Sequence, residues 1–177
     1  VILGLLCWRV IFETHTSRAA AGVRFSPMGD YRRLFSNLKF SAYVMQSGLS
    51  TGVFFTMAAA SSFLMIEYLG RPAREFGLFF ICFPAGFLTG SIISSRLAGC
   101  VAPETMVLTG SVLMITGALT QAGFLFVGIV SPLTIFLPGY FAIMAQGLSL
   151  PNAQSGAIIA AGPLAGTGAG VGVFIQL

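Results

Sequence analysis

Long runs of hydrophobic residues make up most of this chain, and short polar segments separate them. A helix that crosses a bilayer needs about 20 mainly apolar residues, and charges, proline and glycine mark where such helices end. We therefore expect the end of one span at residues 1–12, a polar loop at 13–39 and a complete span at 40–66. Further spans are expected at 78–97, 105–129, 133–150 and 156–177, with breaks at Ser131-Pro132 and at Leu150-Pro151-Asn152. The pattern predicts about five complete spans and part of another.

The composition excludes a soluble domain. Hydrophobic residues are 56% of the chain, charged residues are 8%, and the mean hydropathy is +0.92, whereas soluble domains carry about 25% charged residues. No Asp, Glu, Lys or Arg occurs from residue 105 to residue 177. Charged side chains are therefore too few to cover the surface of a protein in water. The expected fold is an all-α, polytopic bundle of membrane helices that has the lipid bilayer as its partner.

The basic residues gather on one side of the expected helices. Loops 13–39, 98–104 and 151–155 share that side, which carries Arg18, Arg24, Arg32, Arg33, Lys39 and Arg96, while the other side has Arg71 and Arg74. Cytoplasmic loops of membrane proteins are enriched in Lys and Arg, so the loop 13–39 is predicted to lie in the cytoplasm. The net charge is +4, but the basic residues form no face on a folded soluble element, so we expect no nucleic-acid partner.

Glycine recurs at helical spacing in the last apolar stretch. Gly162, Gly166 and Gly170 are four residues apart, with Pro163 beside the first, and Gly86 and Gly90 repeat the spacing in the span 78–97. Small residues at this spacing let two membrane helices approach closely. Two interpretations remain open, namely static packing and a surface on which helices slide or rock.

Polar and aromatic residues share faces of two expected spans. The face in the span 40–66 consists of Tyr43, Gln46, Ser47, Ser50 and Phe54, and the face in the span 133–150 consists of Phe136, Tyr140 and Met144. Aromatic surface with a few hydrogen-bonding groups is typical of a cavity for small amphipathic molecules. The alternative is that serine and glutamine form hydrogen bonds between helices, and that methionine and aromatic residues pack.

No catalytic constellation is present in the sequence. His15 is the only histidine and the three cysteines are far apart, so we expect no metal site and no cofactor. There is no Ser/His/Asp set and no phosphate-binding loop, so we expect neither an enzyme nor ATP-driven transport by this chain. Glu67 and Glu75 lie in a turn near Arg71 and Arg74, where solvated ion pairs are expected.

Several stretches resemble one family of transporters. They are FETH at the end of the first span, YRRLFSNLKFSAYVM at the start of the next, GVFFTMAAASSFLMIEYLGRPAREFGLFF at its end, SSRLAG, and LPNAQSGAIIAAGPLAGTGAGVGVFIQL. Together they are similar to the bicyclomycin/chloramphenicol-resistance (Bcr/CflA) family of drug:proton antiporters in the major facilitator superfamily. Thr56 and Ser62 depart from the family, which often has an aromatic residue and a proline at these positions.

The resemblance implies a fold of two six-helix halves with the substrate near the midplane. Residues 1–12 would be the end of the sixth helix, 13–39 the cytoplasmic loop between halves, and 40–177 the seventh to eleventh helices, in the second six-helix half. The chain begins within an apolar run and without methionine, so we expect a fragment that lacks the amino-terminal half of the same transporter.

The resemblance also implies a function. The protein would lie in the bacterial cytoplasmic (inner) membrane and export drugs or other small amphipathic molecules in exchange for protons, by alternating access. Proton-coupling groups would lie in the missing half, and Arg96 would serve a cytoplasmic gate or simply anchor a helix end. Two other functions remain open, namely an uptake symporter for a nutrient and a non-transporting membrane scaffold subunit.

Overall fold

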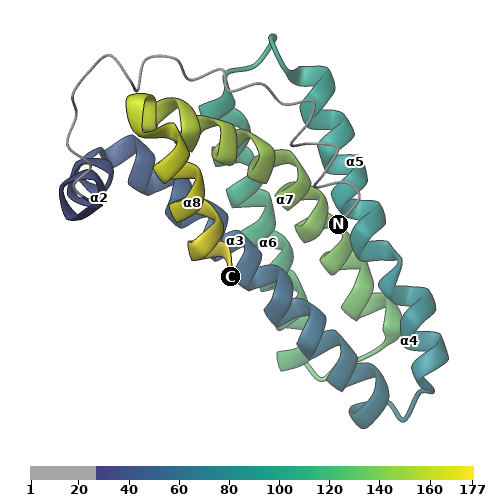
Figure 1. Ribbon diagram of the computed structural model, residues 1–177. Helices are drawn as coiled ribbons and strands as arrows, with labels where there is room; N and C mark the ends of the chain where they lie inside the picture. Colours follow the sequence, from purple (N-terminus) through teal and green to yellow (C-terminus); the bar gives the residue numbers. More distant parts are fainter. Residues whose placement is uncertain (1–26) are drawn as a thin grey trace, which may run out of the picture.

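A computed structural model of the protein describes residues 27–177, which form helices joined by short turns and contain no β-strand (Figure 1). The expected all-α fold is confirmed for this range. The expectations for residues 1–12, and for the loop up to residue 26, lie outside the described residues. The elements are α2 (Pro27–Ser36), α3 (Leu38–Phe63), a π-helical turn (Leu64–Tyr68), α4 (Ala73–Phe80), α5 (Cys82–Leu97), α6 (Pro103–Phe126), α7 (Pro132–Ala161), a 3-10 turn (Gly162–Leu164) and α8 (Ala165–Gln176).

Four helical stretches within the described residues are long and apolar enough to cross a membrane. They are Leu38–Tyr68, Ala73–Leu97, Pro103–Phe126 and Pro132–Gln176. The first three agree with the expected spans 40–66, 78–97 and 105–129, and α4 extends the second of these toward its amino-terminal end.

Helix α7 is the centre of the bundle. It packs against α5, α6, α3 and α8, whereas α3 and α6 barely touch each other. Successive long helices run in opposite directions, so the turns at 98–102 and 162–164 lie at one end and those at 69–72 and 127–131 lie at the other (Figure 1). The long helices α3, α5 and α6 are therefore held together mainly through α7.

Helix α7 has mostly small residues on its buried face and bulky apolar residues on its exposed face. The exposed side chains of α7 include Leu133, Leu137, Phe141, Ile158 and Ile159. Its buried positions are mostly small residues, among them Gly139, Ala142, Ala145, Gly147, Ala153 and Ala157. A protein in water would place polar residues on the outside, whereas lipid accepts large apolar side chains and close helix packing favours small ones. This arrangement, together with the four long apolar helices, indicates a membrane protein.

The division expected at Pro151 is wrong. Helix α7 runs without a break from Pro132 to Ala161, through both Pro138 and Pro151, and the chain turns only at Gly162. In a membrane helix, neighbouring side chains can bond the carbonyls that a proline frees, so the helix need not end there. Gly162 ends α7 because its φ of 54° is one that only glycine adopts without strain. The expected span 156–177 is therefore the end of α7 followed by α8.

Part of the expected loop 13–39 is helical. In α2, Asp30 lies in the first turn and Arg33 in the last, both of which favour the helix dipole. Leu34 is buried in a small apolar cluster with Phe40 of α3 and Val171 of α8. The polar composition of this segment predicted a loop, whereas the structure has an amphipathic helix that packs across one end of the bundle.

Side-chain caps set the starts of two long helices. Asn37 accepts hydrogen bonds from the backbone N–H groups of Lys39 (3.1 Å) and Phe40 (3.4 Å) at the start of α3. Ser131 and Thr134 form a reciprocal capping box at the start of α7. The expected break at Ser131-Pro132 is confirmed, with proline at the first helical position.

Candidate functional site

The contact between α5 and α7 is made at glycine on both sides. A Cβ atom at Gly86 would lie 2.6 Å from the carbonyl oxygen of Tyr140, and one at Gly90 would overlap the backbone at Met144. In the opposite direction, a Cβ atom at Gly147 would overlap the backbone carbonyl of Phe87. The two backbones therefore touch over two helical turns. Close backbone contact replaces the hydrophobic driving force that is weak between helices in lipid.

A layer of polar side chains joins α3, α6 and α7 inside the bundle. The Gln46 amide of α3 donates to Ser111 Oγ of α6 (3.3 Å) and to Ser149 Oγ of α7 (3.2 Å). One turn further along, Gln146 of α7 donates to the carbonyl oxygen of Ser50 at 3.1 Å. Because few partners exist in an apolar interior, each of these bonds fixes which faces of the helices meet.

The polar face of α3 is used mainly for these contacts. The hydroxyls of Ser47 and Ser50 are buried and donate to carbonyls of their own helix, at Tyr43 (2.6 Å) and Ser47 (3.3 Å). The ring of Tyr43 lies against Gly156 of α7. Gln46 keeps one buried oxygen, Oε1, without a hydrogen-bond partner. The structure thus shows bonding between helices for Gln46, whereas the hydroxyls of Ser47 and Ser50 bond within α3. A substrate role for this face stays a prediction.

The aromatic candidates on α7 take two different places. Phe136 is buried and stacks on Phe79 with ring centroids 5.5 Å apart, in a cluster that also contains Phe83. Tyr140 is half-buried, and its hydroxyl donates to Thr89 Oγ1 of α5 at 3.2 Å. Phe136 is therefore a core residue, whereas Tyr140 has a polar group at the α5–α7 contact.

The two remaining candidates differ in their surroundings. Phe54 is partly buried against the same apolar cluster that contains Phe136. Met144 is half-buried, and its backbone faces Gly86 and Gly90 of α5. Neither position yields a hydrogen-bonding group for a ligand. Their predicted place in a substrate cavity stays a prediction.

One polar cluster was not predicted from the sequence. It lies near the end of the bundle that we predict to be cytoplasmic. Asn152 of α7 donates to Ser94 Oγ of α5 (2.7 Å), to Met106 Sδ of α6 (3.5 Å) and to the carbonyl oxygen of Leu148 (2.8 Å). Ser94 is buried. The signal was the Pro151-Asn152 pair, which we interpreted as a turn. In the folded chain it lies in the middle of a helix and ties three helices together.

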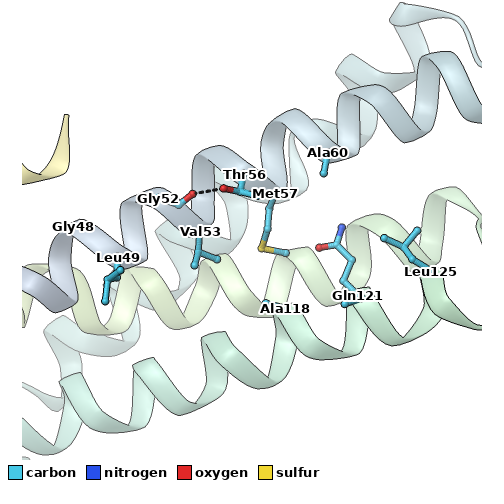
Figure 2. Close-up of a pocket in the computed structure, with 11 residues that line it drawn as sticks. Gly48, Leu49, Gly52, Val53, Thr56, Met57, Ala60, Ala118, Gln121 and Leu125 are labelled. Carbon is cyan, nitrogen blue, oxygen red and sulfur yellow. Dashed lines mark hydrogen bonds between the residues drawn. The ribbon is translucent and has the colours of Figure 1, made fainter.

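A groove of about 530 Å³ runs between α3 and α6 (Figure 2). Gly48 and Gly52 line it on α3, Val53 and Met57 extend toward it, and Gln121 extends from α6. The groove is lined mainly by apolar atoms, and two of its polar side chains donate elsewhere: Thr56 to the carbonyl oxygen of Gly52 at 2.8 Å, and Gln121 to that of Ile135 at 3.2 Å. This surface suits an apolar occupant, because the hydrogen-bonding capacity that would orient a polar one is largely used.

The expected glycine stripe at the end of the chain is not one helix face. Gly162 lies in the turn after α7, and Pro163 is in the short 3-10 turn that follows. Gly166 and Gly170 are in α8, where a Cβ atom would meet nothing within 4 Å among the described residues. Gly168 makes the close contact of α8 instead, because a Cβ atom there would lie 2.7 Å from Cβ of Ala161.

The charged residues lie at the ends of the bundle. Arg71 and Glu75 form an exposed ion pair at 3.4 Å, which agrees with the expected solvated pairing in this turn. Arg96 is exposed in the last turn of α5, where a cation favours the helix dipole. Within residues 27–177, no three His, Cys, Asp or Glu side chains are grouped so that they could hold a metal ion.

Comparisons with models of protein families, with characterised proteins and with solved structures give no match for this chain.

Proposed function

We propose that this chain is part of a membrane transporter that exports drugs or other small amphipathic molecules in exchange for protons. The observation that carries the proposal is the central helix. It contacts α3, α5, α6 and α8, it carries Pro138 and Pro151 within one continuous helix, and the chain turns after it at Gly162. Apolar segments interrupted by glycine and proline are typical of transporters, in which they form substrate sites and permit movement. The resemblance to drug:proton antiporters agrees with this assignment.

The movement that we propose is alternating access. Backbone-to-backbone contact at Gly86, Gly90 and Gly147 leaves little side-chain bulk between α5 and α7 at these positions, which favours a shift of one helix along the other. The carboxylates of residues 27–177 lie near helix ends, at Asp30, Glu67, Glu75 and Glu104. Proton coupling needs an ionisable group whose pKa the membrane interior can shift. We therefore place that group in a second helical bundle, the amino-terminal half that the resemblance implies.

Expression of the protein in a pump-deficient bacterial strain tests this proposal. We expect lower sensitivity to a panel of amphipathic antibiotics, and dye efflux that a protonophore abolishes. Unchanged sensitivity together with efflux indifferent to the protonophore would exclude a drug antiporter. Accumulation of a labelled sugar or organic acid would instead favour uptake, and the absence of any flux would favour a scaffold.

A pair of adjacent substitutions probes the substrate path. Tyr140 is bonded to α5 inside the bundle, whereas Phe141 is 50% exposed on the outer face of α7. We expect Tyr140→Phe to change which antibiotics are exported, and Phe141→Leu to leave export unchanged at equal protein abundance. Equal effects of the two variants would remove Tyr140 from the proposed path.

A further inference from the structure

Pro151 leaves a backbone carbonyl of α7 without its usual donor. In an α-helix the N–H of each residue bonds the carbonyl four residues earlier, and proline has no N–H. Gly147 therefore loses the donor that residue 151 would supply. An unpaired carbonyl is costly in the membrane interior, because no water is there to bond it.

Two side chains act on the turn before Pro151. Ser91 Oγ of α5 donates to the carbonyl oxygen of Gly147 at 3.4 Å. Asn152 Nδ2 donates to the carbonyl oxygen of Leu148 at 2.8 Å. The first donor comes from another helix, and it reaches Gly147 because glycine at positions 90 and 147 brings the two backbones into contact.

The other interior proline, Pro138, has a donor from a neighbouring helix nearby, but at a different carbonyl. Pro138 disturbs the turn that precedes it, and Gln121 Nε2 of α6 donates to the carbonyl oxygen of Ile135 in that turn at 3.2 Å. The carbonyl that Pro138 frees is that of Thr134, four residues earlier, so Gln121 does not replace the missing N–H. Ser91 at Pro151 is therefore the replacement that the structure shows.

We propose that Ser91 and Pro151 form a coupled joint, in which Ser91 is a positioning residue that replaces the missing N–H. Separation of α5 from α7 removes the donor from Gly147 and loosens the helix there, so the stability of α7 at this turn depends on its contact with α5. The segment beyond the joint carries Asn152, which holds Ser94 of α5 and Met106 of α6. This inference concerns the helices themselves and does not rest on the proposed transport activity.

A double-mutant cycle on the whole chain in lipid nanodiscs tests the joint. We expect Ser91→Ala to lower the ratio of folded to unfolded protein about threefold, the average size of a hydrogen bond between membrane helices, and to speed amide exchange in peptides covering residues 147–156. In Pro151→Ala, the new N–H bonds Gly147, so the same serine substitution should change neither quantity. Equal losses in the two backgrounds, or no loss in either, would overturn the joint.

An isosteric pair keeps the test valid if Pro151→Ala does not fold. Ser91→Thr retains a hydroxyl and Ser91→Val does not, while the two side chains have the same shape. We expect slow amide exchange over residues 147–156 in the threonine variant and faster exchange in the valine variant. Ser95→Ala is the matched control, because Ser95 is exposed and donates within its own helix, to the carbonyl of Ile92 at 2.8 Å. Identical exchange in the threonine and valine variants would contradict the proposal.

Discussion

At Gly90, a hydrogen atom in place of a side chain lets α5 lie directly on the backbone of α7, beside Met144 and Leu148. Neighbouring backbone cannot move aside as the end of a flexible side chain can. Polar side chains act at the same scale, since Asn152 reaches acceptors on α5, α6 and its own helix. Single residues thus set both the distance and the register between helices.

Gly90→Ala should destabilise the bundle, because the added methyl group overlaps backbone atoms of α7. We expect a loss of about 1–3 kcal/mol, the usual cost of overpacking, measured as the free energy of unfolding in detergent micelles. Gly123→Ala is the matched control. Gly123 lies in another long helix, α6, and a Cβ atom there would meet nothing within 4 Å. Equal stability of the two variants would show that α5 and α7 are not in backbone contact.

The bond from Asn152 to Ser94 should appear as a coupling energy. We expect Asn152→Ala and Ser94→Ala to be non-additive by about 0.6 kcal/mol, and by at most about 1.7 kcal/mol, in a double-mutant cycle on unfolding. Ser155→Ala serves as the control, because Ser155 is exposed and bonds only within α7. Strict additivity of Asn152→Ala and Ser94→Ala would mean that this bond does not form.

At the scale of elements, α7 and the turn after it determine the arrangement of the bundle. Helix α7 has 30 residues and is about 45 Å long at 1.5 Å per residue, which exceeds a hydrocarbon core of about 30 Å. It must therefore tilt or extend beyond that core. The chain then reverses at Gly162, and α8 packs back on α3 and α7.

Gly162→Ala should weaken this reversal. The backbone at residue 162 has a φ of 54° and a ψ of −119°, a conformation that strains a residue with a Cβ atom by about 1–3 kcal/mol. We expect a lower free energy of unfolding and faster proteolysis near residues 162–165 in micelles. Gly166→Ala in α8 is the control, since it has open space and a helical backbone. If both variants resist proteolysis like the parent protein, α7 does not end at this turn.

At the scale of the whole molecule, the turns alternate between two ends that differ in charge. Lys39 and Arg96 lie at the end with the turn 98–102, and Arg71 and Arg74 lie at the opposite end. Cys100 is an exposed residue of the first end. The orientation in the membrane can therefore be tested with a thiol that the chain already contains.

We expect Cys100 to react with a membrane-impermeant maleimide in inside-out vesicles and to be protected in intact cells, in a background of Cys7→Ser and Cys82→Ser. The physical reason is the preference of basic segments for the cytoplasmic side. A companion variant that also carries Cys100→Ser and Val127→Cys, at an exposed position, moves the thiol to the opposite end and should show the reverse pattern. Labelling of Cys100 from outside intact cells would contradict the predicted orientation.

Much of the helix pattern could be predicted from the sequence, because the hydropathy of a span is a sum over neighbouring residues. The spans around α3, α5 and α6 and the break at Ser131-Pro132 followed from apolar length, charge and capping residues. The helix α2 could not be predicted in this way, because few of its residues are apolar and Leu34 is buried only through contact with α3 and α8. The hydrogen-bond partners of Gln46 and Asn152 also could not be predicted, because the residues that they bond to are distant in sequence.

The amino-acid sequence by itself determined that this chain is a bundle of apolar helices suited to a lipid bilayer, because that property depends on local composition and length. Only the tertiary structure decided that α7 continues through Pro151 and turns at Gly162. A proline inside a membrane helix frees a backbone carbonyl, which a donor elsewhere in the protein can bond. Here a hydroxyl from α5, 56 positions away from Gly147, bonds that carbonyl, and no local pattern encodes such a contact.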